Sequence, residues 1–302
     1  MSAVTIAGSD SGGGAGIQAD LLTFAAHGVY GATVVVAGTA QNTRGIVSVE
    51  PFPARFVAEQ LEAVLSDLAP RAVKIGMLYD APHVRAVAAG LRRCGARNVV
   101  VDPVIRASSG TTLLSPAGLR ELRRTLLPLA DLVTPNLDEA AVLAGMEIRT
   151  DSDRREAARR IGRFGPRAVL VKGGHAAGDR IRDVLWDGRR FHVYEHLRVD
   201  TLATHGTGCT LSAAVAANLA LGHGLEAAVA SAIRYVAAAL RREVFPGRGV
   251  GTPGHRLPSA VSRLTTSSRT DTPAPRKRSR RSRSAPRRVR RPGRDRGSSP
   301  FP

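Results

Sequence analysis

The sequence predicts an α/β fold in which helices cover both faces of a mainly parallel sheet. Short runs rich in Val and Ile alternate with longer segments rich in Ala, Leu and Arg, which is the order of repeated β-α-β units. Polar segments that contain Gly, Asp or Asn follow most of the short runs, where loops would join strands to helices. With 302 residues, 43% of them hydrophobic, the chain is long enough to bury the core of such a fold.

The predicted strands are short apolar runs that end at polar or Gly-containing loops. They cover residues 4–7, 33–37, 72–75, 98–101, 132–134 and 168–172. The predicted helices are longer segments in which apolar side chains recur every three or four positions. They cover residues 17–27, 53–68, 81–94, 116–126, 137–144 and 211–220. Residues 181–199 alternate in polarity and contain an Asp-Gly turn, so we expect a hairpin at the sheet edge.

The charge distribution predicts one folded domain, residues 1–256, followed by a basic tail, residues 257–302. The first 253 residues hold 29 Lys and Arg against 23 Asp and Glu, whereas the last 49 hold 15 against two. Ser, Thr, Pro and Arg dominate the tail without apolar periodicity, so we expect it to be disordered. Because most of the net charge of +19 lies there, it does not indicate that the domain binds nucleic acid.

Cysteine content and hydropathy indicate a soluble, cytoplasmic protein that contacts no membrane. The two cysteines, Cys94 and Cys209, are too few for a disulfide framework, and neither has a partner at metal-ligand spacing. The chain begins MSAVTIAGSD, without the basic and apolar regions of a signal peptide, and no long segment is apolar enough to span a bilayer.

The segment THGTGCTLSAA, residues 204–214, predicts phosphoryl-transfer chemistry. Gly206 and Gly208 let backbone N–H groups close around an anion, and the following helix directs its first amides and positive dipole end at it. We expect that position to lower the pKa of the Cys209 thiol, so that a thiolate accepts a proton from a substrate hydroxyl. The alternative is a Gly-kinked loop that caps a core helix around a buried cysteine.

The segment AGSDSGGGAGIQAD, residues 7–20, predicts a glycine loop between the first strand and its helix. The chain contains no Gly-Lys-Ser/Thr, which excludes a P-loop, and the dinucleotide pattern fits only loosely as Gly14, Gly16 and Ala19. The glycines would also let a small planar molecule approach the backbone, with Asp20 accepting hydrogen bonds from its amino group. A tight strand-to-helix turn without a ligand is the alternative.

Two further loops carry side chains suited to a heterocycle. Gln41, in TAQNT after the second strand, offers a donor and an acceptor to a ring edge. Met77, in VKIGML, is a soft side chain suited to a ring face. Taken singly, Gln41 is equally compatible with an ordinary loop and Met77 with core packing.

Acidic, amide and basic residues follow three later strands. Asp102 follows VVV, where a carboxylate can organise Mg²⁺ through water. Asn136 and Glu139, three residues apart in TPNLDEA, can face one metal–triphosphate site, although a helix cap explains them equally well. Lys172, in VLVKGGH, is a positive charge that can meet a phosphate. Together these strand ends predict a magnesium–nucleotide reaction.

The ordered motifs AGSDSGGGAGIQAD, TAQNT, VKIGML, DPV, TPNLDEA, VKGGH and THGTGCTLSAA closely resemble hydroxymethylpyrimidine and phosphomethylpyrimidine kinases of thiamine biosynthesis. The resemblance covers about residues 4–240 and implies the three-layer sandwich of the ribokinase-like superfamily. It implies a homodimer that phosphorylates 4-amino-5-hydroxymethyl-2-methylpyrimidine, and then its monophosphate, with ATP and Mg²⁺.

The resemblance also implies a role for each matching residue. The pyrimidine would contact Gly8, Asp20, Gln41, Met77 and Val104. Mg²⁺ would be organised by Asp102 and Glu139, and the nucleotide would contact Asn136, Lys172 and Thr207. Cys209 stands where sugar kinases of the superfamily carry an aspartate base, and the amides of residues 206–209, those of Gly206 and Gly208 included, would stabilise the moving phosphoryl group.

Two features depart from the family pattern. Arg234 stands where many relatives have a lysine near the adenine site, and the closing GRGVGTPGHRL matches loosely, so the adenine contacts are not defined. The basic tail is not part of the pattern, and we expect a solvated segment rather than one that binds nucleic acid. The competing hypotheses are a pyridoxal or pyridoxine kinase of the same fold and a degenerate kinase fold that binds nucleic acid through its tail.

Overall fold

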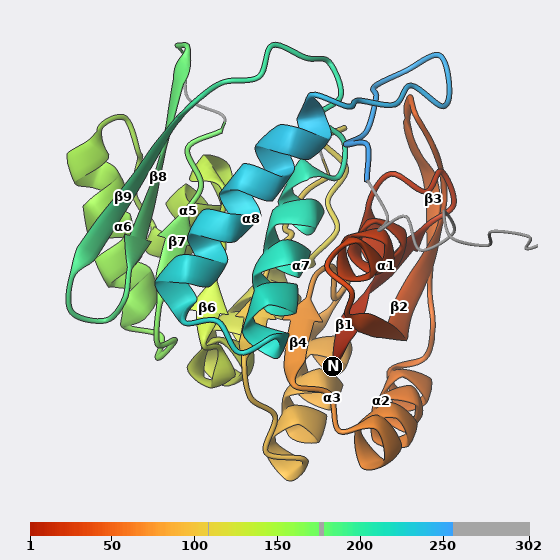
Figure 1. Ribbon diagram of the computed structural model, residues 1–302. Helices are drawn as coiled ribbons and strands as arrows, with labels where there is room; N and C mark the ends of the chain where they lie inside the picture. Colours follow the sequence, from red (N-terminus) through yellow and green to blue (C-terminus); the bar gives the residue numbers. More distant parts are fainter. Residues whose placement is uncertain (108, 175–177, 256–302) are drawn as a thin grey trace, which may run out of the picture. The chain divides into compact units, whose positions relative to one another are not determined.

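The computed structural model describes residues 1–107, 109–174 and 178–255, which fold around one mixed sheet (Figure 1). In the described part of the chain the strand order is β3-β2-β1-β4-β5-β6-β7-β8-β9. The strands are β1 (Ser2–Asp10), β2 (Tyr30–Asn42), β3 (Gly45–Pro51), β4 (Ala72–Ile75), β5 (Val99–Val101), β6 (Leu132–Val133), β7 (Val169–Val171), β8 (Arg180–Trp186) and β9 (Phe191–Leu197).

The centre of the sheet is parallel and both of its edges are antiparallel. Strands β2, β1, β4, β5, β6 and β7 pair in parallel, as the repeated β-α-β pattern predicts. Strand β3 folds back on β2, and β8 and β9 form the predicted hairpin beside β7. Because parallel strands end at the same edge, the loops that carry the conspicuous motifs meet there.

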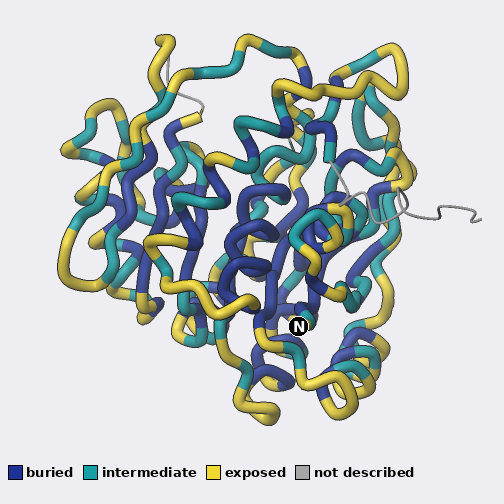
Figure 2. The backbone as a smooth tube through the Cα atoms, viewed as in Figure 1, coloured by how far each residue is buried: buried dark blue, intermediate teal, exposed yellow. Residues whose placement is uncertain are grey.

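Helices cover both faces of the sheet, so the domain has three layers (Figure 1). One face packs against α2 (Ala54–Leu68), α3 (Ala81–Arg93), α4 (Pro116–Glu121), α5 (Leu137–Ala144) and α6 (Asp151–Gly162). The other packs against α1 (Gly16–Ala26), α7 (Thr207–Ala220) and α8 (Leu225–Leu240). Alternate strand residues serve the two layers: Val73 and Ile75 face the first, and Ala72 faces the second. Strands β4 to β7 and helix α7 are the most buried of the described elements (Figure 2).

Several element boundaries differ from the sequence prediction. β4 and α5 have the predicted bounds, but β2 extends to Asn42, so all of TAQNT except Thr43 lies in a strand and not in a loop. Helix α7 begins at Thr207, four residues before the predicted start, because Gly206 caps it. The helix predicted at 116–126 becomes a π-helical turn after Glu121, at Leu122–Leu126.

Strand β3 and helices α6 and α8 were not predicted. β3 is a partly exposed edge strand without a continuous apolar face. α6 is rich in Arg and Asp, and it buries only Arg154, Ala157, Ala158 and Ile161. Packing against the rest of the domain therefore supplies stability that local propensity does not.

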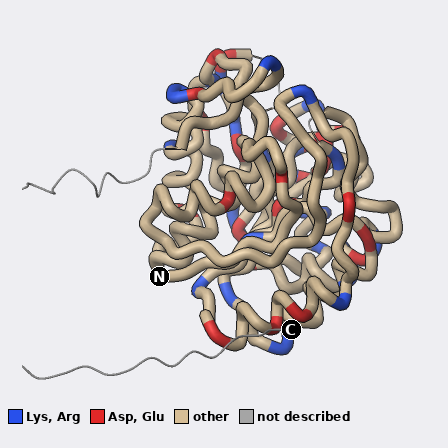
Figure 3. The backbone as a smooth tube through the Cα atoms, turned by 90° about the vertical axis from the view of Figure 1, so that its right-hand side faces the viewer, with Lys and Arg blue, Asp and Glu red and all other residues tan. Residues whose placement is uncertain are grey.

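The chain divides into two units, Met1–Ser259 and Ala260–Pro302. The predicted disordered tail, residues 257–302, lies outside the described residues. Within the described part, Lys and Arg positions are interspersed with Asp and Glu positions (Figure 3). None of the helices described combines the length and hydropathy needed to cross a bilayer.

Candidate active site

A cleft of about 1330 Å³ opens where the central strands end. It brings together residues from the glycine loop, from the loops after β4, β5, β6 and β7, and from the first turn of α7. The sequence-predicted site residues that line it are Gly8, Gln41, Met77, Asp102, Val104, Asn136, Glu139, Lys172, Gly206, Thr207, Gly208 and Cys209. Asp20 is not among the lining residues.

The Asp10 carboxylate organises the glycine loop. It accepts hydrogen bonds from the backbone N–H groups of Gly12 at 2.8 Å, Gly14 at 3.1 Å and Ala15 at 2.9 Å. The His205 ring lies 2.9 Å from the same carboxylate. Burial opposes ionisation of Asp10, but these hydrogen bonds, that of His205 foremost, lower its pKa. A single carboxylate thus joins the first loop of the chain to the loop before α7.

The two glycine-rich loops touch where no side chain fits. Gly206 has φ +80°, and a Cβ built on it would lie 1.8 Å from the carbonyl oxygen of Gly14. Both the left-handed backbone and the contact require glycine. The Gln41 side-chain nitrogen lies 3.1 Å from His205 Nε2, which adds the end of β2 to this junction.

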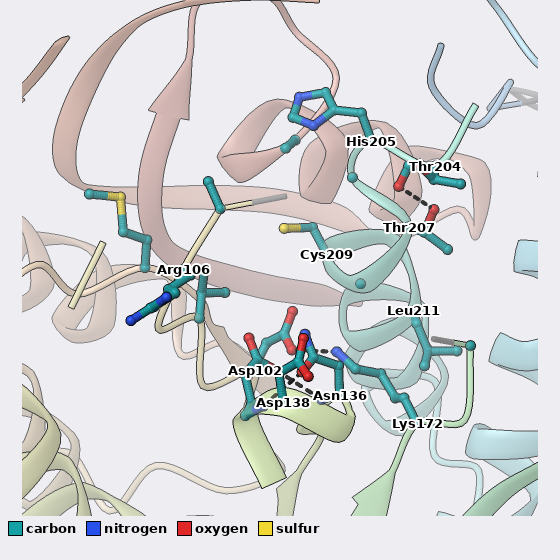
Figure 4. Close-up of a pocket in the computed structure, with 18 of the residues that line it drawn as sticks. Asp102, Arg106, Asn136, Asp138, Lys172, Thr204, His205, Thr207, Cys209 and Leu211 are labelled. Carbon is teal, nitrogen blue, oxygen red and sulfur yellow. Dashed lines mark hydrogen bonds and ion pairs between the residues drawn. The ribbon is translucent and has the colours of Figure 1, made fainter. Parts of the chain in front are cut away.

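The first turn of α7, where we predict an anion pocket, lines the cleft. The N–H groups at a helix start have no partner within the helix, so those of Gly208 and Cys209 are available to an anion. A Cβ on Gly208 would lie 3.2 Å from Lys172 Nζ and 3.6 Å from Asp102 Oδ2. Glycine therefore lets the start of the helix approach a charged pair that also lines the cleft. The Cys209 side chain extends from this turn into the cleft (Figure 4).

The predicted lowering of the Cys209 pKa is wrong for this structure. Burial raises the pKa of the thiol to about 11, while the positive charge of Lys74 acts to lower it. Although Cys209 is only partly buried, its loss of solvation outweighs the effect of the helix terminus, because a thiolate depends on contact with water more than a thiol does. Cys209 lines the cleft, and its resting form is the thiol.

Asp102 is a buried carboxylate of the cleft with three side-chain hydrogen-bond partners. It is 2% exposed, and its Oδ1 accepts hydrogen bonds from Lys172 Nζ at 2.8 Å and Thr134 Oγ1 at 3.2 Å. Ser212 Oγ, in α7, donates to Oδ2 at 3.3 Å. Burial opposes ionisation of Asp102, but Lys172 and Lys74 lower its pKa. The carboxylate stays charged and close to the anion pocket.

Asn136 and Glu139 form the helix cap of the alternative interpretation and also line the cleft, while their part in a metal–triphosphate site stays a prediction. The Glu139 N–H donates to Asn136 Oδ1 at 2.8 Å, and the Asn136 N–H donates to Glu139 Oε2 at 2.9 Å. This reciprocal pair is a capping box at the start of α5. Burial raises the pKa of Glu139 to about 7, Lys172 opposes the shift and the Asp102 charge adds to it.

The cleft also has an apolar wall. Met77, Leu113 and Ala37 form a small buried cluster with Val104 packed against it. A Cβ on Gly8 would lie 2.8 Å from Met77 Sδ, so the strand end and the methionine are in direct contact. A flat ring fits such a wall better than a flexible chain does.

We predicted that Asp20 contacts a ligand, but its side chain is buried and does not line the cleft. The side chain has 0% exposure, and its Oδ2 accepts hydrogen bonds from Thr5 Oγ1 at 2.5 Å and Lys74 Nζ at 2.8 Å. α1 directs it into the layer beneath the cleft, where it forms an ion pair. Arg234 also does not line the cleft, although Ile233 and Val236 of the same helix do.

The family comparison agrees with this geometry. The sequence pattern of the family described as phosphomethylpyrimidine kinase matches residues 10–254. This chain belongs to that family. It is 51% identical over 259 residues to the hydroxymethylpyrimidine/phosphomethylpyrimidine kinase of Rhizobium meliloti. The matched region covers 84% of this chain and 97% of that kinase.

A second relative is longer. The chain is 49% identical over 257 residues to the thiamine biosynthesis bifunctional protein ThiED of Geobacter sulfurreducens. That match covers 85% of this chain but only 52% of the relative, so this chain spans about half of the bifunctional protein.

Solved structures confirm the ribokinase-like fold of this kinase. The ADP complex of Bacillus subtilis pyridoxal kinase matches with a TM-score of 0.79 and 38% identity, covering 85% of this chain and 97% of that one. Phosphomethylpyrimidine kinase from Clostridium difficile matches with a TM-score of 0.71 and 41% identity, covering 78% and 98%. Both are kinases of small heterocycles, and a nucleotide substrate follows from membership of a kinase family.

Sequence reasoning missed three polar residues of this region, namely Asp10, Lys74 and His205. Asp10 and His205 lie inside quoted motifs but are 195 positions apart, so their contact has no local signal. Lys74 is a lysine within the otherwise apolar strand β4, and that interruption was the available signal.

Proposed function

We propose that the protein phosphorylates 4-amino-5-hydroxymethyl-2-methylpyrimidine, and then its monophosphate, with ATP. The observation that carries this proposal is the convergence in one cleft of the first turn of α7, the Cys209 thiol and an apolar wall beside the Gln41 side-chain amide. Membership of the phosphomethylpyrimidine kinase family supports the choice of substrate.

The apolar wall is the proposed pyrimidine site. Met77 and Val104 would cover the ring faces, Gly8 would let the ring approach β1, and Gln41 would pair with the polar ring edge. Asp20 lies too deep to touch the ring in this conformation, so its substrate contact stays a prediction.

The part of the cleft that carries Asp102 and Glu139 is the proposed Mg–ATP site. Asp102 and Glu139 are buried carboxylates. Burial raises the pKa of Glu139 and the Asp102 charge adds to the shift, so a divalent cation would be a favourable neighbour. They would hold Mg²⁺ through water, and the ion supplies positive charge to the nucleotide phosphates. Lys172, Asn136 and Thr207 line the same side and would contact the nucleotide.

The chemistry is a direct phosphoryl transfer. After Cys209 loses its proton to solvent, its thiolate accepts the proton of the substrate hydroxymethyl group. The hydroxyl oxygen bonds to the γ-phosphorus, the bond from that phosphorus to the β–γ bridging oxygen breaks, and ADP leaves. The amides of residues 206–209 stabilise the charge on the moving phosphoryl group. In the second reaction, a phosphate oxygen of the monophosphate attacks instead.

A coupled ADP-release assay with the hydroxymethylpyrimidine and Mg–ATP tests the proposal. We expect turnover, and we expect Cys209→Ala to lose most of kcat while retaining substrate affinity, because a base acts chiefly in the transition state. Folded protein that binds nucleotide but turns over neither pyrimidine would reject the proposal.

Pyridoxal phosphorylation is the second candidate, because the pyridoxal kinase of Bacillus subtilis matches with the higher TM-score of the two structures compared above. Direct competition between the aminopyrimidine and pyridoxal decides between them. An aminopyrimidine offers Gln41 a donor–acceptor edge that a hydroxypyridine lacks, so we expect it to have the larger kcat/KM.

We further propose that residues 1–256 form the complete catalytic domain of a cytoplasmic homodimer. Deleting residues 257–302 should leave kinase activity unchanged, and sedimentation should give a dimer. Polyanion binding by the full chain without any kinase activity would instead favour the nucleic-acid-binding alternative.

A further inference from the structure

Arg106 is an arginine that lines the cleft without an acidic partner. Figure 4 shows its side chain in the cleft, on the loop that joins β5 to α4. The residue is exposed, and within the described part of the chain its guanidinium forms neither a salt bridge nor a hydrogen bond. Because a guanidinium is permanently charged and presents several N–H donors in a fixed plane, Arg106 is suited to contact an anion in the cleft.

The backbone of Arg106 is held in place by pairing with a later part of the same loop. Arg106 and Thr112 form an antiparallel β-bridge. Beside this bridge, the Leu113 N–H donates a hydrogen bond to the Ile105 carbonyl oxygen at 2.9 Å. The point from which the side chain extends is therefore set by the fold, although the side chain itself is exposed.

The residues on either side of Arg106 contact the two parts of the cleft to which we assign the substrates. On one side, burial raises the pKa of the Glu139 carboxyl, and a hydrogen bond from the Ile105 backbone opposes that shift. On the other side, Ala107 packs against the apolar wall that contains Met77. Arg106 therefore extends from a point between the proposed Mg–ATP site and the proposed pyrimidine site.

The other cationic side chains of the cleft have partners within the protein. The Nζ atoms of Lys74 and Lys172 each lie 2.8 Å from a carboxylate oxygen. Arg198 donates hydrogen bonds to two backbone carbonyl oxygens. Of the Lys and Arg residues that line the cleft in the described part of the chain, Arg106 is the one whose charged group has no such interaction.

The second proposed substrate brings a charge that the first does not. The pyrimidine monophosphate carries a phosphate group, whereas the alcohol is uncharged there. The lining residues that we assign to the ring are all uncharged, and six Asp and Glu residues line the cleft against four Lys and Arg residues. A phosphate group bound among them needs a cation nearby, because like charges repel and a cleft supplies less water to screen them than bulk solvent does.

We propose that Arg106 binds the phosphate group of the pyrimidine monophosphate and so serves the second phosphorylation specifically. The γ-phosphate of ATP already has Mg²⁺, Lys172 and the amides of residues 206–209 assigned to it, whereas the phosphate of the monophosphate has no cation of its own. An arginine suits this role because its planar guanidinium can donate paired hydrogen bonds to one phosphate group. The inference rests on the proposed function and names a recognition residue for its second substrate.

A comparison of the two substrates isolates this role. Initial rates at saturating Mg–ATP give KM and kcat for the alcohol and, separately, for the monophosphate, in the parent, Arg106→Gln and Arg106→Lys. Arg97→Gln is the matched control, because Arg97 is also an exposed arginine but precedes β5 and does not line the cleft. Calorimetric titration of each pyrimidine into nucleotide-free protein measures binding apart from turnover.

The effect should be confined to the phosphorylated substrate. We expect Arg106→Gln to raise the KM and the dissociation constant of the monophosphate about tenfold or more, because a charge-assisted contact is lost. The constants for the alcohol and the KM for ATP should stay at the parent values. Arg106→Lys should recover part of the affinity, because it keeps the charge but not the planar donor group. Arg97→Gln should match the parent.

Unchanged constants for the monophosphate in Arg106→Gln overturn the inference. Equal losses for the alcohol and the monophosphate also overturn it, as does a rise in the KM for ATP alone, which would assign Arg106 to the nucleotide. The proposed function fails separately, when the parent turns over neither pyrimidine; the titrations then still decide whether Arg106 recognises the monophosphate. A parent that binds neither pyrimidine would overturn both.

Discussion

The pH dependence of the chemical step is the sharpest consequence of the observed site. A base must be deprotonated, and burial raises the pKa of Cys209 to about 11. Across neutral pH the thiolate is therefore the minor form, and its population rises tenfold for each pH unit. From about pH 7 to about pH 9 the thiolate fraction rises from about 1 in 10,000 to about 1 in 100. We expect the rate of phosphoryl transfer to rise about 100-fold over this range.

Single-turnover rapid quench at saturating Mg–ATP and pyrimidine measures that step apart from product release. Cys209→Ala is the control, and its residual rate should not show the thiolate-dependent rise. A parent rate that is flat from pH 7 to pH 9 would mean a thiolate already formed at neutral pH, which contradicts the burial argument. An equal rise in Cys209→Ala would assign the pH dependence to another group.

Three substitutions test the packing. Gly206→Ala should lower kcat at least about 100-fold in the ADP-release assay, because a Cβ would lie 1.8 Å from the Gly14 oxygen. Gly208→Ala should raise the KM for ATP roughly tenfold by displacing Lys172, 3.2 Å from the new Cβ, and an unchanged KM would contradict that. Leu61→Ala should lower the free energy of unfolding in urea by about 2–5 kcal/mol with kcat unchanged.

Local pattern was sufficient for the parallel centre of the sheet and for most of the loops that meet at its edge. Buried strands such as β4 and β5 are short Val-rich runs, and the glycines of THGTGC carry a backbone requirement that any reader of the sequence can recognise. Edge strand β3 and helix α6 were not predicted from the sequence because neither has a clear apolar face. Both are held by packing against the rest of the domain.

The sequence by itself determined most of the strands and helices, because these depend on contacts within a few residues. It also determined the edge at which the motifs meet, because the β-α-β order predicts parallel strands, and the chemical types of side chain available there. Only the tertiary structure decided that Lys74 pairs with Asp20, 54 positions away, that His205 joins Asp10, and that Cys209 rests as a thiol. Ion pairing and pKa depend on burial and on charges brought together across the fold, and no local sequence pattern records either.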